Sequence, residues 1–215
     1  IPENSRILDC CAGTGIYAFA LAKQHRVVVG DLSEKHIAQM KELQKDAPQL
    51  EEIHWLDARH MGIFEDESFD VVLCMGALYH LFSYEDRMNA IRECVRLCKK
   101  GGILVFAYLN KWGNFYNGMI NNLKPMDLLY REFDSGNHED IFFRTTAEEV
   151  NAMCQALNLI CLRNIGVDHL AFLSSERIDA MSDEEYAHLL DYQLKATQEP
   201  NIAGASLHGL WIGRK

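Results

Sequence analysis

Several features are scarce or missing in this sequence, and each absence narrows the range of functions. No apolar run approaches the ~20 residues that a membrane-spanning helix needs, and no secretory signal peptide is visible. Positive charge is scarce: 21 Lys and Arg residues stand against 31 Asp and Glu residues, giving a formal net charge of −10. Because a nucleic-acid-binding protein needs a basic face, we expect no nucleic acid among the partners. The lack of a long apolar run leads us to expect no membrane partner either.

The cysteines lack the spacings that mark metal or disulfide sites. Seven are present, with no C-x-x-C pair, and no set of His, Asp and Glu has convincing metal-ligand spacing. Cys10 and Cys11 are expected to pack as small buried residues, and Cys94 and Cys98, four apart on a predicted helix, to belong to the core. We therefore expect no metal and a cytoplasmic, reducing location.

The stretch from Arg6 to Ala22 organises the chain. It begins as an apolar run typical of a buried strand, breaks at Gly13 and Gly15, and continues as a helical pattern. A strand, a glycine turn and a helix bring bare backbone close to a ligand at the helix N-terminus. Asp9, at the carboxyl end of the strand, is expected to face the same crevice.

Four more buried strands are predicted, at residues 26–30, 53–56, 69–75 and 103–109. Ser33 is expected to cap a second helix, and another is predicted over 85–99, ended by Gly101-Gly102. We interpret the series as alternating strands and helices, which predicts a doubly wound, parallel α/β sheet. Right-handed crossovers bring the carboxyl ends of its strands to one edge, where such sheets bind ligands.

The second half of the chain is less regular. Residues 110–145 lose periodicity and are rich in Asn, Gly and aromatic residues, which predicts a substrate lid or a short helical insert within a single 215-residue domain. The capping box Thr146-Ala147-Glu148-Glu149 predicts a helix start. A sixth strand at 159–166, a helix capped by Ser182 and a final strand at 206–213 complete the expected fold.

The residues of the glycine turn resemble two cofactor motifs. Gly13 to Ala18 reads as G-x-G-x-x-A, a dinucleotide-binding pattern. With Asp9 included, the stretch resembles the D-x-G-x-G-x-G motif of the class I S-adenosylmethionine (SAM) methyltransferases, with Cys11 and Ala12 as departures. The late pair of strands is also similar to that family. The resemblance implies a seven-stranded, Rossmann-like sheet of order 3-2-1-4-5-7-6, with strand seven antiparallel.

The resemblance also implies cofactor contacts with SAM and its product S-adenosylhomocysteine. Asp31 would hold both ribose hydroxyls, and Asp57 would meet the adenine amino group beside the backbone N–H of Ala58. A helix cap or a solvated side chain is the alternative for Asp31, and a turn cap for Asp57. The complete set of expected cofactor residues is Asp9, Cys11, Ala12, Gly13, Gly15, Tyr17, Asp31, Leu32, Asp57, Ala58 and Met75.

The segment Met75-Gly76-Ala77-Leu78-Tyr79-His80 resembles the acceptor-side motif of small-molecule members of the family. His80 and Tyr79 are therefore the catalytic candidates, and His80 could take a proton from a hydroxyl or thiol acceptor. A helix-start histidine bonded to backbone is an equal alternative for His80. The expected acceptor contacts are Tyr79, Tyr108, Trp112, Tyr116 and Arg144. For Arg144, an ion pair with Glu148 or Glu149 is the alternative.

Taken together, these patterns predict a SAM-dependent methyltransferase acting on a small molecule. The alternatives are an NAD(P)-dependent oxidoreductase and a catalytically silent SAM-binding protein. Asp9, Asp31 and Asp57 each follow a predicted strand and are expected to surround one glycine turn. This arrangement favours SAM, because the dinucleotide pattern does not require a second acid after the third strand. The acceptor, its reacting atom and the oligomeric state are not readable from the sequence.

Overall fold

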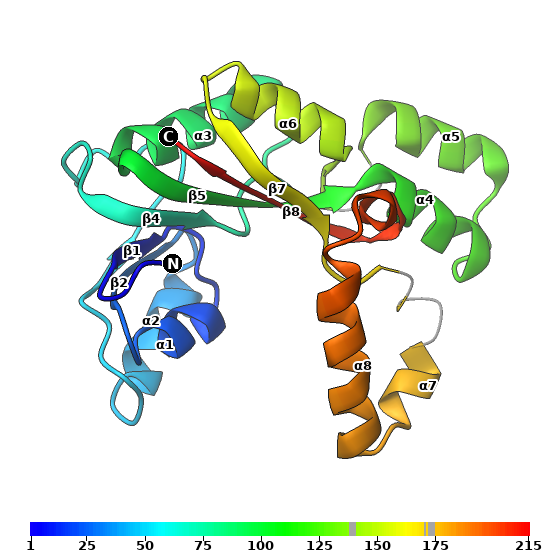
Figure 1. The fold of residues 1–215 in the computed structure, drawn as a ribbon. Coiled ribbons are helices and arrows are strands. Elements are labelled where there is room, and N and C mark those ends of the chain that lie inside the picture. Colours follow the sequence, from blue (N-terminus) through cyan, green and yellow to red (C-terminus); the bar gives the residue numbers. More distant parts are fainter. Residues whose placement is uncertain (138–140, 170, 172–174) are drawn as a thin grey trace. The chain divides into compact units, whose positions relative to one another are not determined.

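The computed structural model describes residues 1–137, 141–169, 171 and 175–215 (Figure 1). Contacts divide the chain into two compact units. Unit 1 comprises residues 1–106, 153–162 and 212–215, and unit 2 comprises residues 107–152 and 163–211. Among the described residues, no helix combines the length and the apolar character that a membrane span requires.

Unit 1 is built on parallel strands that the sequence predicts well. Strand β1 (Arg6–Asp9) pairs in parallel with β2 (Arg26–Asp31) and with β4 (Phe69–Cys74), and β2 pairs with β3 (Glu52–Trp55). The β-branched run Val27–Val29 is fully buried, as a strand covered on both faces requires. These pairings bring the carboxyl ends of β1, β2 and β4 to one edge.

Three helices flank these strands. Helices α1 (Ile16–Leu21) and α2 (Glu34–Leu43) lie on one side, and α3 (Tyr84–Leu97) lies on the other (Figure 1). The Ser33 side chain accepts a hydrogen bond from the His36 backbone N–H, which confirms the predicted cap of α2. Ser83 caps α3 in the same way through the backbone N–H of Asp86.

Two expectations about connections are wrong. Residues 56–68, between β3 and β4, form turns without a helix, so the strand–helix alternation is interrupted there. Helix α3 ends at Leu97, and strand β5 (Cys98–Asn110) begins immediately, so Gly101-Gly102 does not end the helix. Instead, β5 pairs with β4 through Cys98 and again from Ile103, and the residues between form a bulge in which Gly101 has φ +75°.

The order of hydrogen-bonded strands is β3-β2-β1-β4-β5-β8-β7. Strand β8 (His208–Arg214) runs antiparallel to β5, because Asn110 bonds to Leu207 while Gly101 and Gly102 bond to Lys215. With β7 (Ile160–Gly166) beside β8, this confirms the predicted order of seven strands. An additional short strand, β6 (Arg144–Thr145), was not expected and pairs in parallel with the end of β5.

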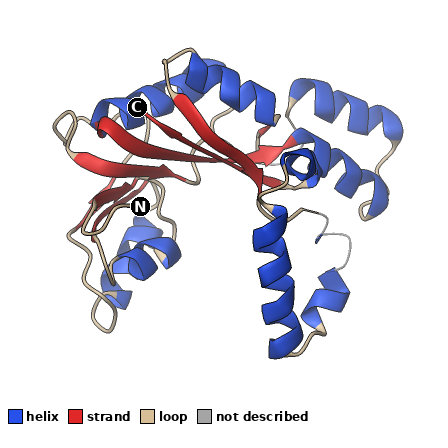
Figure 2. Cartoon of the chain, in the orientation of Figure 1, coloured by secondary structure: helices blue, strands red, loops and turns tan. Residues whose placement is uncertain are grey.

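Unit 2 is mainly helical (Figure 2). The aperiodic segment 110–145 contains two helices, α4 (Lys111–Ile120) and α5 (Met126–Ser135), and therefore has the helical form of the predicted insert. The Thr146 capping box is confirmed at the start of α6 (Ala147–Gln155), as is the Ser182 cap of α8 (Asp183–Ala196). Helix α7 (Ser175–Asp179) and the 3-10 helix Pro200–Ala205 were not expected from the sequence.

Candidate functional site

A pocket of about 640 Å³ opens in unit 1 at the carboxyl ends of β1, β2 and β4. This is the edge at which parallel α/β sheets bind ligands, and the volume suits a cofactor-sized molecule. The pocket is lined by Asp9, Cys10, Cys11, Ala12, Gly13, Thr14, Ile16, Tyr17, Asp31, Leu32, Ser33, His36, Leu56, Asp57, Ala58, Arg59, Met75, Gly76, Ala77, Tyr79, His80 and Leu81. All predicted cofactor residues except Gly15 are among them.

The glycine turn shapes one side of the pocket. Gly13 has φ +55°, and a Cβ added there would meet no atom within 4 Å, so the turn leaves open space beside its backbone. Gly15 has φ +85° and is the N-cap of α1; an added Cβ would come within 2.9 Å of the Phe19 ring. The two glycines thus act differently, because Gly13 keeps space for a ligand and Gly15 permits close packing of the helix start.

Asp31 is held by the protein itself. Its Oδ2 accepts a hydrogen bond from the Gly13 backbone N–H at 2.7 Å, and its Oδ1 accepts one from the Ser33 N–H at 2.8 Å. The Nδ1 atom of His36 lies 3.1 Å from the same Oδ1. A carboxylate has about four lone-pair positions, so Asp31 keeps acceptor capacity for a ligand while it fixes the glycine turn.

Asp57 is paired with Arg59. The Arg59 guanidinium donates from Nε to Oδ1 at 3.0 Å and from Nη2 to Oδ2 at 2.6 Å, in a fork-like arrangement. These hydrogen bonds hold the pKa of Asp57 below its ordinary value. Arg59 also lies 3.5 Å from Asp86 of α3. The carboxylate is therefore charged and already partnered on the side that the guanidinium occupies.

Asp9 has a different environment. Its side chain is 1% exposed, and its Oδ1 has no hydrogen-bond partner among the described residues. Burial raises the pKa of Asp9 to about 7, against the lowering effect of a backbone hydrogen bond from Cys11. A buried carboxylate oxygen without a partner is costly, and it marks a place where a positively charged ligand group would be stabilised.

Tyr79 and His80 line the same pocket, after the end of β4. The Tyr79 hydroxyl donates to the Met75 carbonyl oxygen at 2.9 Å, and burial raises the pKa of the phenol. The centroids of the Tyr79 and His80 rings lie 5.0 Å apart. The His80 backbone N–H donates to the Ala77 carbonyl, which fixes the turn that carries the imidazole.

The other predicted acceptor contacts belong to unit 2. Tyr108 is 2% exposed, donates to Asn164 Oδ1 at 2.8 Å and packs against Gly209. Arg144 is also buried, and its Nη1 donates to the Phe142 carbonyl at 2.5 Å. Both side chains therefore have partners within unit 2, and their contact with an acceptor stays a prediction. Trp112 and Tyr116, by contrast, are 47% and 45% exposed.

Sequence comparisons decide the family. Residues 8–106 match a family model described as a methyltransferase domain. A protein of Paracidovorax citrulli, named ubiquinone biosynthesis O-methyltransferase, is 32% identical over 173 residues, which cover 78% of this chain and 68% of that protein. The chain belongs to the class I SAM-dependent methyltransferase family. A methyltransferase of the same name from Hydrogenovibrio crunogenus is 28% identical over 196 residues, covering 90% of this chain and 77% of that protein.

Solved structures of methyltransferases share the fold. A SAM-dependent methyltransferase from Methanosarcina mazei has a TM-score of 0.67 at 18% identity and covers 100% of this chain and 94% of that one. The 1,6-didemethyltoxoflavin-N1-methyltransferase from Burkholderia thailandensis, solved with S-adenosylhomocysteine, has a TM-score of 0.62 at 14% identity, covering 99% and 72% of the two chains. These likenesses support the predicted Rossmann-like fold.

The pocket of this methyltransferase suits its cofactor, SAM. SAM carries a positively charged sulfonium and an ammonium group, and the unpartnered oxygen of Asp9 supplies a buried acceptor for positive charge. The open space beside Gly13 leaves room for ligand atoms against the backbone. The family assignment makes the chain a SAM-dependent enzyme that methylates a small molecule, and it replaces the oxidoreductase and the catalytically silent alternatives.

Some pocket residues of the methyltransferase were not identified from the sequence. His36 lies on the first turn of α2 and reaches back to Asp31, and Arg59 pairs with an acid two positions earlier. The sequence does carry a signal for the Asp57–Arg59 pair, because an arginine two residues after an aspartate at the end of a strand can reach its carboxylate. His36 could be predicted to reach Asp31 only after Ser33 is identified as the N-cap of the helix. The N-cap fixes where the helix begins, and therefore which side chains of its first turn face the end of the strand.

Proposed function

We propose that this methyltransferase transfers the methyl group to a hydroxyl oxygen of a small phenolic acceptor, with His80 and Tyr79 at the reacting end. The observation that carries this proposal is that both side chains line the pocket that also contains Asp9 and Asp31. The names of the two relatives, ubiquinone biosynthesis O-methyltransferases, support oxygen as the acceptor atom. The N1-methyltransferase among the structural neighbours makes nitrogen the competing acceptor to test.

SAM, when bound, supplies an electrophilic methyl group. The Asp9 carboxylate would stabilise the positive charge of the ligand, and Asp31 would accept hydrogen bonds from the ribose hydroxyls with His36 beside it. Asp57, fixed by Arg59, would accept from the adenine amino group. The remaining proposed contacts come from Cys11, Ala12, Gly13, Tyr17, Leu32, Ala58 and Met75, which line the same pocket, while Gly15 shapes the turn.

His80 is the proposed base. A phenolic hydroxyl becomes a better nucleophile as it loses its proton, and histidine is the side chain best suited to accept one near neutral pH. Tyr79 is less suited to this step, because its hydroxyl already donates to the Met75 carbonyl and burial raises its pKa. We assign Tyr79 to positioning: its ring would form a wall against a planar acceptor, next to the His80 imidazole.

The helices of residues 110–145 are proposed to supply acceptor specificity. Trp112 packs on Phe133 at 4.4 Å between ring centroids yet remains 47% exposed, and Tyr116 on the same helix is 45% exposed. Exposed, firmly packed aromatic rings suit recognition of an aromatic acceptor. Trp112→Ala should then raise the KM for the acceptor several-fold and leave the Kd for SAM unchanged.

The test uses purified enzyme, SAM and three probe acceptors: catechol, an aromatic amine and an aromatic thiol. We expect methyl transfer to catechol, detected by mass spectrometry. His80→Gln should lower kcat by about 10²–10⁴-fold and leave SAM affinity intact, as expected for loss of a general base. His188→Gln, at an exposed position on α8, is the matched control. Transfer only to the amine or the thiol, or full activity of His80→Gln, would refute the proposal.

We also propose a cytoplasmic location and no nucleic-acid partner. The seven free cysteines support the location, and the formal net charge of −10 supports the absence of a nucleic-acid partner.

A further inference from the structure

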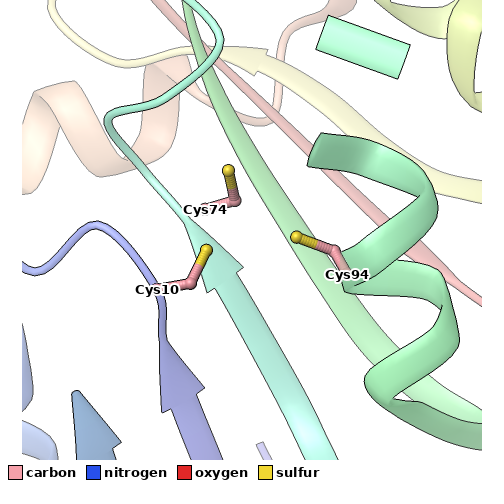
Figure 3. A group of neighbouring side chains, drawn as sticks. All are labelled: Cys10, Cys74 and Cys94. Carbon is pink, nitrogen blue, oxygen red and sulfur yellow. The ribbon is translucent and has the colours of Figure 1, made fainter. Parts of the chain in front are cut away.

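Three buried cysteines converge beside the pocket. Cys10 follows β1, Cys74 ends β4 and Cys94 lies on α3, so the fold brings them together from three separate elements (Figure 3). Their sulfur atoms all lie within 4.8 Å of one another. Each of the three residues is at most 1% exposed.

The arrangement is fixed by the backbone. The Cys10 backbone N–H donates to the Leu73 carbonyl at 3.0 Å, which holds Cys10 beside the end of β4 and therefore beside Cys74. Cys94 belongs to the buried face of α3, together with Ile91 and Leu97. The thiols thus meet through strand pairing and helix packing, without depending on flexible surface segments.

A fourth sulfur lies next to this group. The Sγ atoms of Cys10 and Cys11 are 3.8 Å apart, and Cys11 is partly exposed and lines the pocket. Cys11 thus connects the buried sulfurs with the space that solvent and ions can enter. The ordinary explanation, small residues filling a core, does not require the sulfur atoms of Cys10, Cys74 and Cys94 to gather at one point.

The distances suit a thiophilic metal ion. A Zn–S bond of about 2.3 Å places sulfur ligands roughly 3.8–4 Å apart in tetrahedral or trigonal geometry. The three sulfurs, within 4.8 Å of one another, need to approach by at most about an ångström to reach these distances. Thiolates favour soft ions, and a divalent ion leaves less net negative charge on a buried tris-thiolate group than a monovalent ion would.

We propose that Cys10, Cys74 and Cys94, with Cys11 available as a fourth ligand, form a binding site for one divalent thiophilic ion of the zinc class. Binding replaces three S–H bonds by three metal–sulfur bonds and releases three protons to the solvent. No oxidation or reduction is involved. The site adjoins the cofactor pocket, which Cys10 and Cys11 also line, while the proposed methyl transfer itself needs no metal.

The direct test titrates the reduced, metal-free protein with Cd²⁺ and then with competing Zn²⁺. We expect a thiolate-to-cadmium absorption band that saturates at one equivalent and disappears when Zn²⁺ displaces Cd²⁺. X-ray absorption of the zinc-loaded protein should show three or four sulfur neighbours at about 2.3 Å. A shell with fewer than three sulfurs, or no saturation at one equivalent, would overturn the proposal without any variant.

Variants locate the ligands. Cys94→Ala should weaken Cd²⁺ and Zn²⁺ binding by roughly 100-fold. Cys98→Ala is the matched control, because Cys98 is equally buried directly after the same helix but its thiol faces the Ile103 carbonyl. Cys161→Ala controls for the exposed thiol. Circular dichroism verifies folding of each variant. Equal metal affinity in folded Cys94→Ala and Cys98→Ala would refute the assignment.

Discussion

Two walls of the pocket carry aspartates in opposite states. On the buried wall, formed by Asp9 and Cys10, the carboxylate has a raised pKa and an oxygen without a partner in the described part of the chain. On the outer wall, formed by Asp31, His36, Asp57 and Arg59, each carboxylate is already held by backbone N–H groups or by a cation. The carboxylates of the outer wall are therefore preorganised without ligand. The charged form of Asp9 on the buried wall is destabilised by desolvation until a positively charged ligand group binds beside it.

The glycine turn joins the two walls, and its alteration should have the largest effect. Gly13 donates its N–H to Asp31 and has φ +55°, with open space where a side chain would point. Gly13→Val should reduce SAM affinity by more than about 100-fold, because the side chain enters the pocket and strains the backbone. Gly62→Val, which also points into open space but lies outside the pocket, is the control for calorimetry. Normal SAM binding by Gly13→Val would show that the turn does not face the cofactor.

The buried wall is tested by Asp9→Asn. The folded pKa of about 7 exceeds the ordinary 3.8, so the folded state holds the proton more tightly and wild-type stability falls as pH rises through this interval. Above pH 7 the neutral amide should increase the free energy of unfolding by up to about 4 kcal/mol, with the gain vanishing near pH 4.

Urea unfolding of the cofactor-free protein between pH 4 and 8 measures this difference. SAM affinity should change in the opposite direction, because the amide no longer offers a charged acceptor. A variant that is less stable than the wild type at pH 8 would contradict the account of the buried wall.

The outer wall is tested by Asp31→Ala. Loss of the carboxylate should weaken SAM binding by about 1.5–3 kcal/mol, the range for hydrogen bonds that involve a charged group. It also removes the acceptor of the Gly13 and Ser33 N–H groups, so the free energy of unfolding should fall as well. Asp46→Ala, at an exposed position after α2, serves as the control in calorimetry and urea unfolding. Unchanged affinity would mean that the ribose is bound elsewhere.

The smallest effect is expected for Arg59→Ala. The pair with Asp57 is partly exposed, with side chains 31% and 19% accessible, so its loss should cost less than about 1 kcal/mol of unfolding free energy. Because Arg59 lowers the folded pKa of Asp57, this contribution is present at neutral pH and disappears as acid protonates the carboxylate. Urea unfolding at a series of pH values from 7 downward should show this cost shrinking as the pH falls, and a cost that does not change with pH would assign Arg59 a packing role instead.

The sequence predicted the buried wall better than the outer wall. Strand β1 and the turn at Gly13 were predictable, because an apolar run followed by glycines admits few local structures. The partners of Asp31 and Asp57 were not, because side-chain pairing depends on which rotamers the folded backbone allows. The ion pair of Asp57 with Arg59 is the clearest example.

The remaining differences have similar physical origins. The first and last residues of helices α4 and α5 could not be predicted from the sequence. The exposed aromatic residues Trp112, Tyr116 and Tyr130 interrupt the helical spacing of buried apolar residues on which such a prediction depends. The end of α3 was misplaced because a strand bulge at Gly101 uses the same residues that usually stop a helix. Gathering of Cys10, Cys74 and Cys94 depends on tertiary packing, which no spacing along the chain reveals.

The most direct measurement is calorimetry of the purified chain with SAM, S-adenosylhomocysteine and NAD. Buried Asp9, the open turn at Gly13 and the partnered Asp31 together predict that SAM and S-adenosylhomocysteine bind with micromolar affinity and that NAD does not. Both methyltransferase ligands should lose affinity in Gly13→Val. Tight binding of NAD without binding of SAM would contradict the account.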